Sequence, residues 1–110
     1  RQQNNRSPNM PTPETAYHAA ASAIAESENT QMFGKPCYKL NGTSFVSFFQ
    51  DEMAFKLGGT DHANALALSG AQLFDPSQKG RPFKAWVQVP YAHAEQWPAL
   101  ARIAAKFATE

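Results

Sequence analysis

The chain has 110 residues and a formal net charge of +1, and 43% of its residues are hydrophobic. This length fits one domain whose core is large enough to need no disulfide or metal. The small net charge excludes a protein that is strongly basic over its whole surface, so any nucleic-acid contact requires a local patch. No apolar run approaches the roughly 18 residues that cross a bilayer, so we expect no membrane segment.

The opening residues, RQQNNRSPN, are polar and have no hydrophobic face to bury. We therefore expect a flexible lead over 1–11 and a single domain over 12–110. Cys37 is the only cysteine and cannot form an internal disulfide, and no signal-peptide pattern opens the sequence. Both observations favour the reducing environment of the cytoplasm.

The first predicted element is a helix. Thr12 is a typical N-cap, Pro13 suits the first helical position, and Glu14 suits the positive end of the helix dipole. The spacing of apolar residues predicts a helix over 13–27. Its buried stripe should consist of Tyr17, Ala20, Ala21, Ile24 and Ala16.

Three short apolar runs over 32–59 predict an antiparallel meander. Asn41-Gly42 is the signal of a type I′ hairpin, because both central residues of that turn adopt positive φ. We place the second turn at Asp51-Glu52. The expected strands span 36–40, 44–50 and 53–57.

The second half of the chain predicts a short helix, more sheet and a last helix. Thr60 and Asp61 offer an N-cap for a helix that ends at Gly70. A strand should follow over 83–89 and a helix over 92–108. The buried face of that helix should carry Trp97, Leu100, Ala101, Ala104 and Phe107, with Ile103 beside them. The expected fold is therefore α+β, with an antiparallel sheet of about five strands and N-terminal, middle and C-terminal helices.

Alternation along the strands assigns the two faces of this sheet. One face should be apolar and receive the two longer helices; it carries Met53, Phe55, Leu57, Phe83, Ala85, Val87 and Val89. The strand over 44–50 has aromatic residues on both faces. A loop, a helix or another copy of the chain must cover part of it, which admits a homodimer.

The opposite face carries the candidate binding residues, which are Lys39, Lys56, Lys84 and Trp86, with Lys79 and Arg81 in a nearby loop. Spaced cations around an aromatic ring suit a nucleic-acid partner, because bases stack on the ring while ammonium groups neutralise phosphate. The alternative is that the lysines form the solvated side of a one-sided sheet and that Trp86 lies beneath a neighbouring loop. The usual exposure of lysines favours this second interpretation.

Cys37 is the one candidate nucleophile, with His18, His62 and His93 as available bases. A single free cysteine on a strand is usually a small buried hydrophobe, so we predict no catalytic residue. None of the paired short spacings of zinc sites occurs among His62, His93, Asp61 and Cys37. We therefore expect no metal and no cofactor.

Several unlike motifs occur in an order that resembles the TfoX N-terminal-like family of small bacterial proteins (the TfoX/Sxy family), which is related to the YjbR-like group. The motifs are Met32-Phe33-Gly34, Phe55-Lys56, Asp75-Pro76, Gly80-Arg81-Pro82 and the final helix with Trp97. The resemblance implies an α+β fold with flanking helices. It also implies a role in regulation, since the family takes its name from regulators of natural competence, and DNA binding by analogy of shape with the YjbR-like relatives. Those regulators carry a second, C-terminal helical domain, so this chain resembles a single-domain member.

Two functions follow from these observations. The first is a non-enzymatic binding or regulatory module with a protein or nucleic-acid partner. The alternative is a small-ligand-binding protein, or an enzyme that uses Cys37 with a nearby histidine.

Overall fold

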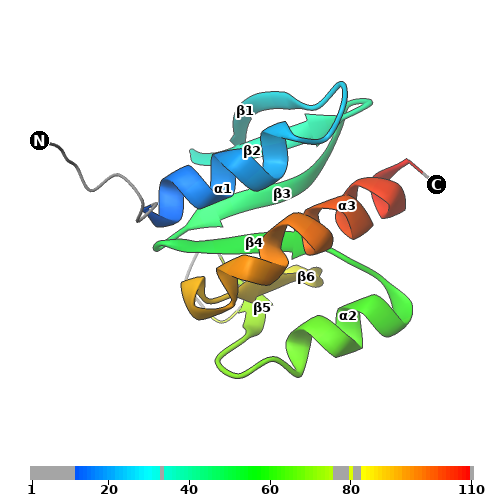
Figure 1. The fold of residues 1–110 in the computed structure, drawn as a ribbon. Coiled ribbons are helices and arrows are strands. Elements are labelled where there is room, and N and C mark those ends of the chain that lie inside the picture. The colour runs from blue at the N-terminus through cyan, green and yellow to red at the C-terminus, as the bar shows by residue number, and fades with distance from the viewer. Residues whose placement is uncertain (1–11, 33, 76–79, 81–82, 110) are drawn as a thin grey trace, which may run out of the picture.

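A computed structural model describes residues 12–32, 34–75, 80 and 83–109. The predicted lead over 1–11 and two of the candidate binding residues, Lys79 and Arg81, lie outside the described residues. Within them the chain forms three α-helices, a 3-10 helix and a six-stranded antiparallel sheet (Figure 1). The predicted α+β class and the three predicted helices are confirmed.

The strands follow the order β1-β2-β3-β4-β6-β5 across the sheet. Their bounds are β1 Glu28–Met32, β2 Lys35–Leu40, β3 Thr43–Phe49, β4 Glu52–Lys56, β5 Gln72–Phe74 and β6 Phe83–Val89. The helices are α1 Pro13–Ser22, α2 Gly59–Leu66, the 3-10 helix η1 Tyr91–Gln96 and α3 Trp97–Ala108. Strand β1 was not predicted, because this polar edge strand shows no apolar alternation.

Helix α1 begins as predicted and ends early. Thr12 Oγ1 accepts a hydrogen bond from the backbone N–H of Thr15 at 3.1 Å, which makes it the N-cap. The helix stops at Ser22. Shortly after it, Ser27 Oγ donates to the carbonyl of Ala21 at 3.1 Å, so a side chain satisfies one of the helix's last carbonyls while the chain turns toward β1.

The two hairpins of the meander have similar turns. Asn41 and Gly42 have φ of 53° and 80°, which confirms the predicted type of turn. The second turn lies one residue earlier than predicted: Gln50 and Asp51 have φ of 53° and 62°. Glu52 instead pairs with the last residue of β3 and belongs to the ladder.

Helix α2 also begins earlier than predicted. Gly58 is its N-cap, with φ of −140°, so Thr60 and Asp61 lie inside the first turn. The extended backbone of Gly58 ends the preceding strand and starts the helix without a side-chain cap. Gly70 has φ of 84° in the turn before β5.

Helices α1 and α3 cover one face of the sheet, and α2 lies beside β6 (Figure 1). The main core lies beneath α1 and α3, and Phe55, Val87 and Trp97 are fully buried in it. The predicted apolar assignment of Met53, Phe55, Leu57, Val87 and Val89 is confirmed.

Phe107 departs from the predicted helix face. It is 37% exposed, and its ring lies over Gly58, where an added Cβ would be 2.6 Å from the ring. It therefore covers the junction between β4 and α2 instead of entering the core.

A second apolar cluster lies on the opposite face of the sheet and consists of Phe49, Ala54, Phe74 and Trp86, with Phe83 packed against it. Alternation in the sequence predicts Phe83 and Ala85 on the helix face. Phe83 belongs to this second cluster and Ala85 is exposed. The register between β5 and β6 shifts at Leu73/Phe74, where Phe74 pairs with Phe83, so simple alternation fails at the start of β6.

Candidate functional site

Trp86 does not form an exposed platform. Its side chain is 6% exposed, and its ring centroid lies 5.8 Å from that of Phe74. Phe74 in turn contacts Phe49 and Phe83 at 5.6 and 6.0 Å between ring centroids. Because Trp86 is buried beside Phe74, it offers no open face on which a base could stack, which favours the alternative in which Trp86 is not an exposed platform.

The three lysines of the candidate site lie at one end of the sheet. Strands β2 and β4 are both antiparallel to β3, and β6 is antiparallel to β4. The end of β2, the end of β4 and the start of β6 therefore lie together. Lys39, Lys56 and Lys84 occupy these positions, and we call them the lysine row.

Two members of the lysine row, Lys39 and Lys56, lie on the face opposite to the main core. Tyr38 and Leu40 belong to the main core, as do Phe55 and Leu57, so Lys39 and Lys56 between them point to the other face. Lys84 is exposed. Lys39 and Lys56 are half-buried, as expected for long side chains whose stems lie on a sheet.

Two neighbours act on the lysine row. Lys39 lies directly opposite Glu28 in β1, so one carboxylate partly offsets its charge. His62 Nε2 donates to the backbone carbonyl of Lys84 at 2.7 Å, which attaches α2 to the start of β6. At Lys84, therefore, a tertiary hydrogen bond holds the backbone of the lysine row in place.

Cys37 receives no support as a nucleophile. It is fully buried, and its Sγ lies 3.7 Å from Ser44 Oγ. In the described part of the chain, His18 Nδ1 bonds with the Tyr38 hydroxyl at 2.9 Å, and His93 Nε2 donates to the carbonyl of Ser69 at 2.9 Å. With His62 bound to a carbonyl as well, the three histidines have structural partners.

No metal centre is formed by the residues that the structure describes, since no three His, Cys, Asp or Glu side chains gather there. Among the same residues, no helix combines the length and apolar composition needed to cross a bilayer.

Tyr17 is the most unusual polar group of the main core. Its side chain is fully buried, and its hydroxyl has no hydrogen-bond partner among the described residues. Burial raises the pKa of this hydroxyl, and Coulombic interactions with Cys37 and Tyr38 raise it further. Burial also raises the pKa of Tyr38. Both phenols are therefore held neutral, which argues against a role as a base.

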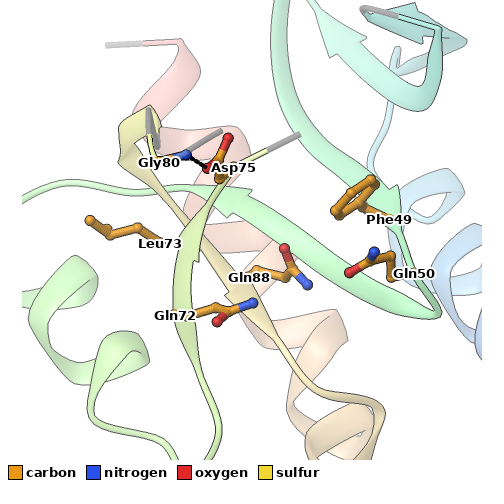
Figure 2. Close-up of a pocket in the computed structure, with 7 residues that line it drawn as sticks. All are labelled: Phe49, Gln50, Gln72, Leu73, Asp75, Gly80 and Gln88. Atoms are coloured by element: carbon orange, nitrogen blue, oxygen red, sulfur yellow. Dashed lines mark hydrogen bonds between the residues drawn. The ribbon is translucent and has the colours of Figure 1, made fainter. Parts of the chain in front are cut away.

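A cavity of about 370 Å³ opens beside Phe49 and Gln88 (Figure 2), on the face of the sheet that carries the second cluster. Its described lining consists of Phe49, Gln50, Gln72, Leu73, Asp75, Gly80 and Gln88. Gln88 is only 2% exposed, and its Nε2 donates to Glu52 Oε1 at 2.7 Å. The Gly80 backbone N–H donates to Asp75 Oδ2 at 3.0 Å, which fixes that carboxylate beside the cavity.

This cavity was not predicted from the sequence. Its three glutamines lie on a turn and two strands, and only strand pairing brings them together: Gln72 lies directly opposite Gln88. Gln88, near the end of the largely apolar run over 83–89, was the one local signal.

Comparisons with protein-family models, curated proteins and solved structures find no match for this chain. The resemblance to the TfoX N-terminal-like family therefore remains a prediction that depends on the motifs in the sequence.

Proposed function

We propose that this domain is a non-enzymatic binding or regulatory module whose partner, a nucleic acid or a protein, lies on the lysine row. The observation that carries the proposal is the register, which gathers three cations from three strands at one end of the sheet. Such a local patch attracts phosphates in a protein of small net charge, because each neutralised phosphate releases counterions. A nucleic acid is the partner that this arrangement favours.

The sequence motifs support a regulatory role. On them we place the chain in the TfoX N-terminal-like family, as a bacterial member that takes part in transcription regulation. The free, buried thiol of Cys37 suits the reducing cytoplasm, which we propose as its compartment.

Salt-dependent binding tests the nucleic-acid version. We expect random single- and double-stranded DNA to bind. The logarithm of the binding constant should fall linearly with the logarithm of the salt concentration between about 50 and 200 mM. Replacing Lys39, Lys56 and Lys84 together by Gln should reduce the slope for duplex DNA by about 2 to 3, because each phosphate contact contributes about 0.9. Fluorescence anisotropy with labelled strands measures both quantities.

The matched control is Lys106→Gln, which removes an exposed lysine from α3 on the other side of the sheet. It should leave the slope unchanged. If the parent protein leaves the anisotropy of the labelled strands unchanged at low salt, the result contradicts a nucleic-acid partner and leaves a protein partner. Equal slopes for the triple variant and its parent contradict the assignment to the lysine row.

A further inference from the structure

The cavity beside β5 and β6 has an oriented amide in its floor. Gln88 is almost fully buried, and its Nε2 donates to Glu52 Oε1 at 2.7 Å. Because a carboxylate only accepts hydrogen bonds, the nitrogen must face Glu52 and the oxygen must face the other way. In Figure 2 the Gln88 oxygen is turned toward the side on which Asp75 and Phe49 lie. The floor therefore presents an acceptor in a fixed position.

Two more amides line the cavity from other elements. Gln50 lies in the turn between β3 and β4, and Gln72 lies on β5, directly opposite Gln88. Both are exposed, and Figure 2 shows Gln50 and Gln72 on two sides of Gln88. An amide offers an acceptor and a donor side by side in one plane, which is the pattern that reads the edge of a nucleobase.

Phe49 forms the apolar wall, and its position is fixed. It is 8% exposed, its ring lies 5.6 Å from that of Phe74, and Lys35 Nζ lies 5.0 Å from its centroid. An aromatic wall beside in-plane amides accommodates a flat polar ring.

Glu52 lies against the floor amide, so a carboxylate adjoins the inner end of the cavity. This carboxylate disfavours a second anion at the floor, where a neutral ring fits better than a phosphate. The volume of about 370 Å³ lies at the small end of the usual range of ligand sites.

Gln50 is held in place by its hairpin turn. Its φ of 53° is the conformation that such a turn requires of its first central residue. Asn, Asp and Gly are more common than Gln at this φ. The turn therefore holds a long amide at a position that shorter side chains usually occupy.

We propose that this cavity binds one unpaired nucleobase, with Gln88 Oε1 accepting a base N–H, the amides of Gln50 and Gln72 contacting its edge, and Phe49 contacting the ring. For a base that belongs to a strand, the inference rests on the proposed function, since the strand's phosphates would lie on the lysine row. A free nucleoside offers the same chemistry without phosphate.

The two sites are close enough to serve one strand. Lys56 lies directly opposite Trp86 on β6, and Gln88 follows two residues later. Two residues of a β-strand span about 7 Å. A base at Gln88 and its neighbouring phosphates at the lysine row therefore fit a short stretch of nucleic acid.

The first arm of the test uses free nucleosides with the full chain. We expect at least one of adenosine, guanosine, cytidine and uridine to shift the side-chain amide NMR signals of Gln72 and Gln88 saturably. Glucose and ribose should leave them unchanged. Equal shifts with either sugar, or no shift with any nucleoside up to its solubility, overturn the inference.

The second arm compares a single strand with an abasic strand of equal length by anisotropy. Gln72→Ala removes an exposed amide and should weaken the nucleoside and the base-bearing strand alike, by about three- to tenfold for one hydrogen bond. It should not alter binding of the abasic strand. Gln31→Ala, which removes an exposed glutamine from β1, is the matched control and should change neither.

The two arms separate the two proposals. Lysine-dependent binding that is equal for both strands overturns the base site and supports the proposed function. Nucleoside binding without any strand binding supports the base site and overturns a nucleic-acid function for the lysine row.

Discussion

At the scale of single residues, Tyr17 shows that burial of a polar group is not always compensated. Its hydroxyl lies in the main core without a partner among the described residues, while the Tyr38 hydroxyl bonds with His18 at 2.9 Å. Tyr17→Phe should therefore raise the free energy of unfolding by about 1 kcal/mol, because it removes a desolvated group that gains no bond. Urea unfolding at neutral pH measures this change.

The matched control is Tyr38→Phe, which loses a bond and should lower the free energy of unfolding by about 1 kcal/mol. Alkaline pH gives a second readout. An unfolded chain loses phenolic protons near the ordinary pKa of 10.0, whereas burial raises the pKa of Tyr17 in the fold. Stability is thus complete below that pH and falls above it. Tyr17→Phe should flatten the fall; a loss of stability at neutral pH would instead reveal a partner for the hydroxyl.

At the scale of elements, the sequence predicted the features that depend on interactions between neighbouring residues, such as helix caps and tight turns. Thr12 caps α1 and the turn at Asn41-Gly42 has positive φ because these residues favour such conformations by themselves. Strand β1 could not be predicted, since its polar residues form a strand only through pairing with β2. The start of β6 was misassigned because the register shift beside Phe83 depends on its pairing with β5.

The same distinction applies to the candidate sites. Strict alternation was enough to place Lys39 and Lys56 on the open face. Alternation could not decide between exposure and burial of Trp86, because its burial depends on contact with Phe74 from another strand. The cavity depends on three elements that are distant in sequence, so its glutamines gave no recognisable motif.

Truncation of the two tryptophans compares the two apolar clusters. Trp97 on α3 is fully buried in the main core, and Trp86 on β6 is 6% exposed in the second cluster. Trp97→Ala and Trp86→Ala should each lower the free energy of unfolding by about 3 to 5 kcal/mol. Leu66→Ala, at an exposed position of α2, should cost far less. A cost below about 1 kcal/mol for Trp86→Ala would place its ring at the surface.

At the scale of the whole molecule, the chain buries one face of its own sheet and part of the other. Helices α1 and α3 bury one face, and the rings of the second cluster bury part of the other. The aromatic residues of β3 are divided between them: Phe45 lies in the main core and Phe49 in the second cluster. The sequence left a homodimer open because these residues needed cover, and the described part of one chain provides it.

We therefore predict a monomer in solution. Stable homodimers usually bury a large and rather apolar patch. The large hydrophobic side chains exposed in the described part of the chain are Leu66, Tyr91 and Phe107, which lie on three different helices. Scattered residues of this kind are ordinary surface. Sedimentation equilibrium at micromolar concentration should give the mass of one chain, with or without a bound nucleoside. The mass of two chains would contradict the prediction and would point to the unpaired edge of β1, where a second sheet could continue the first.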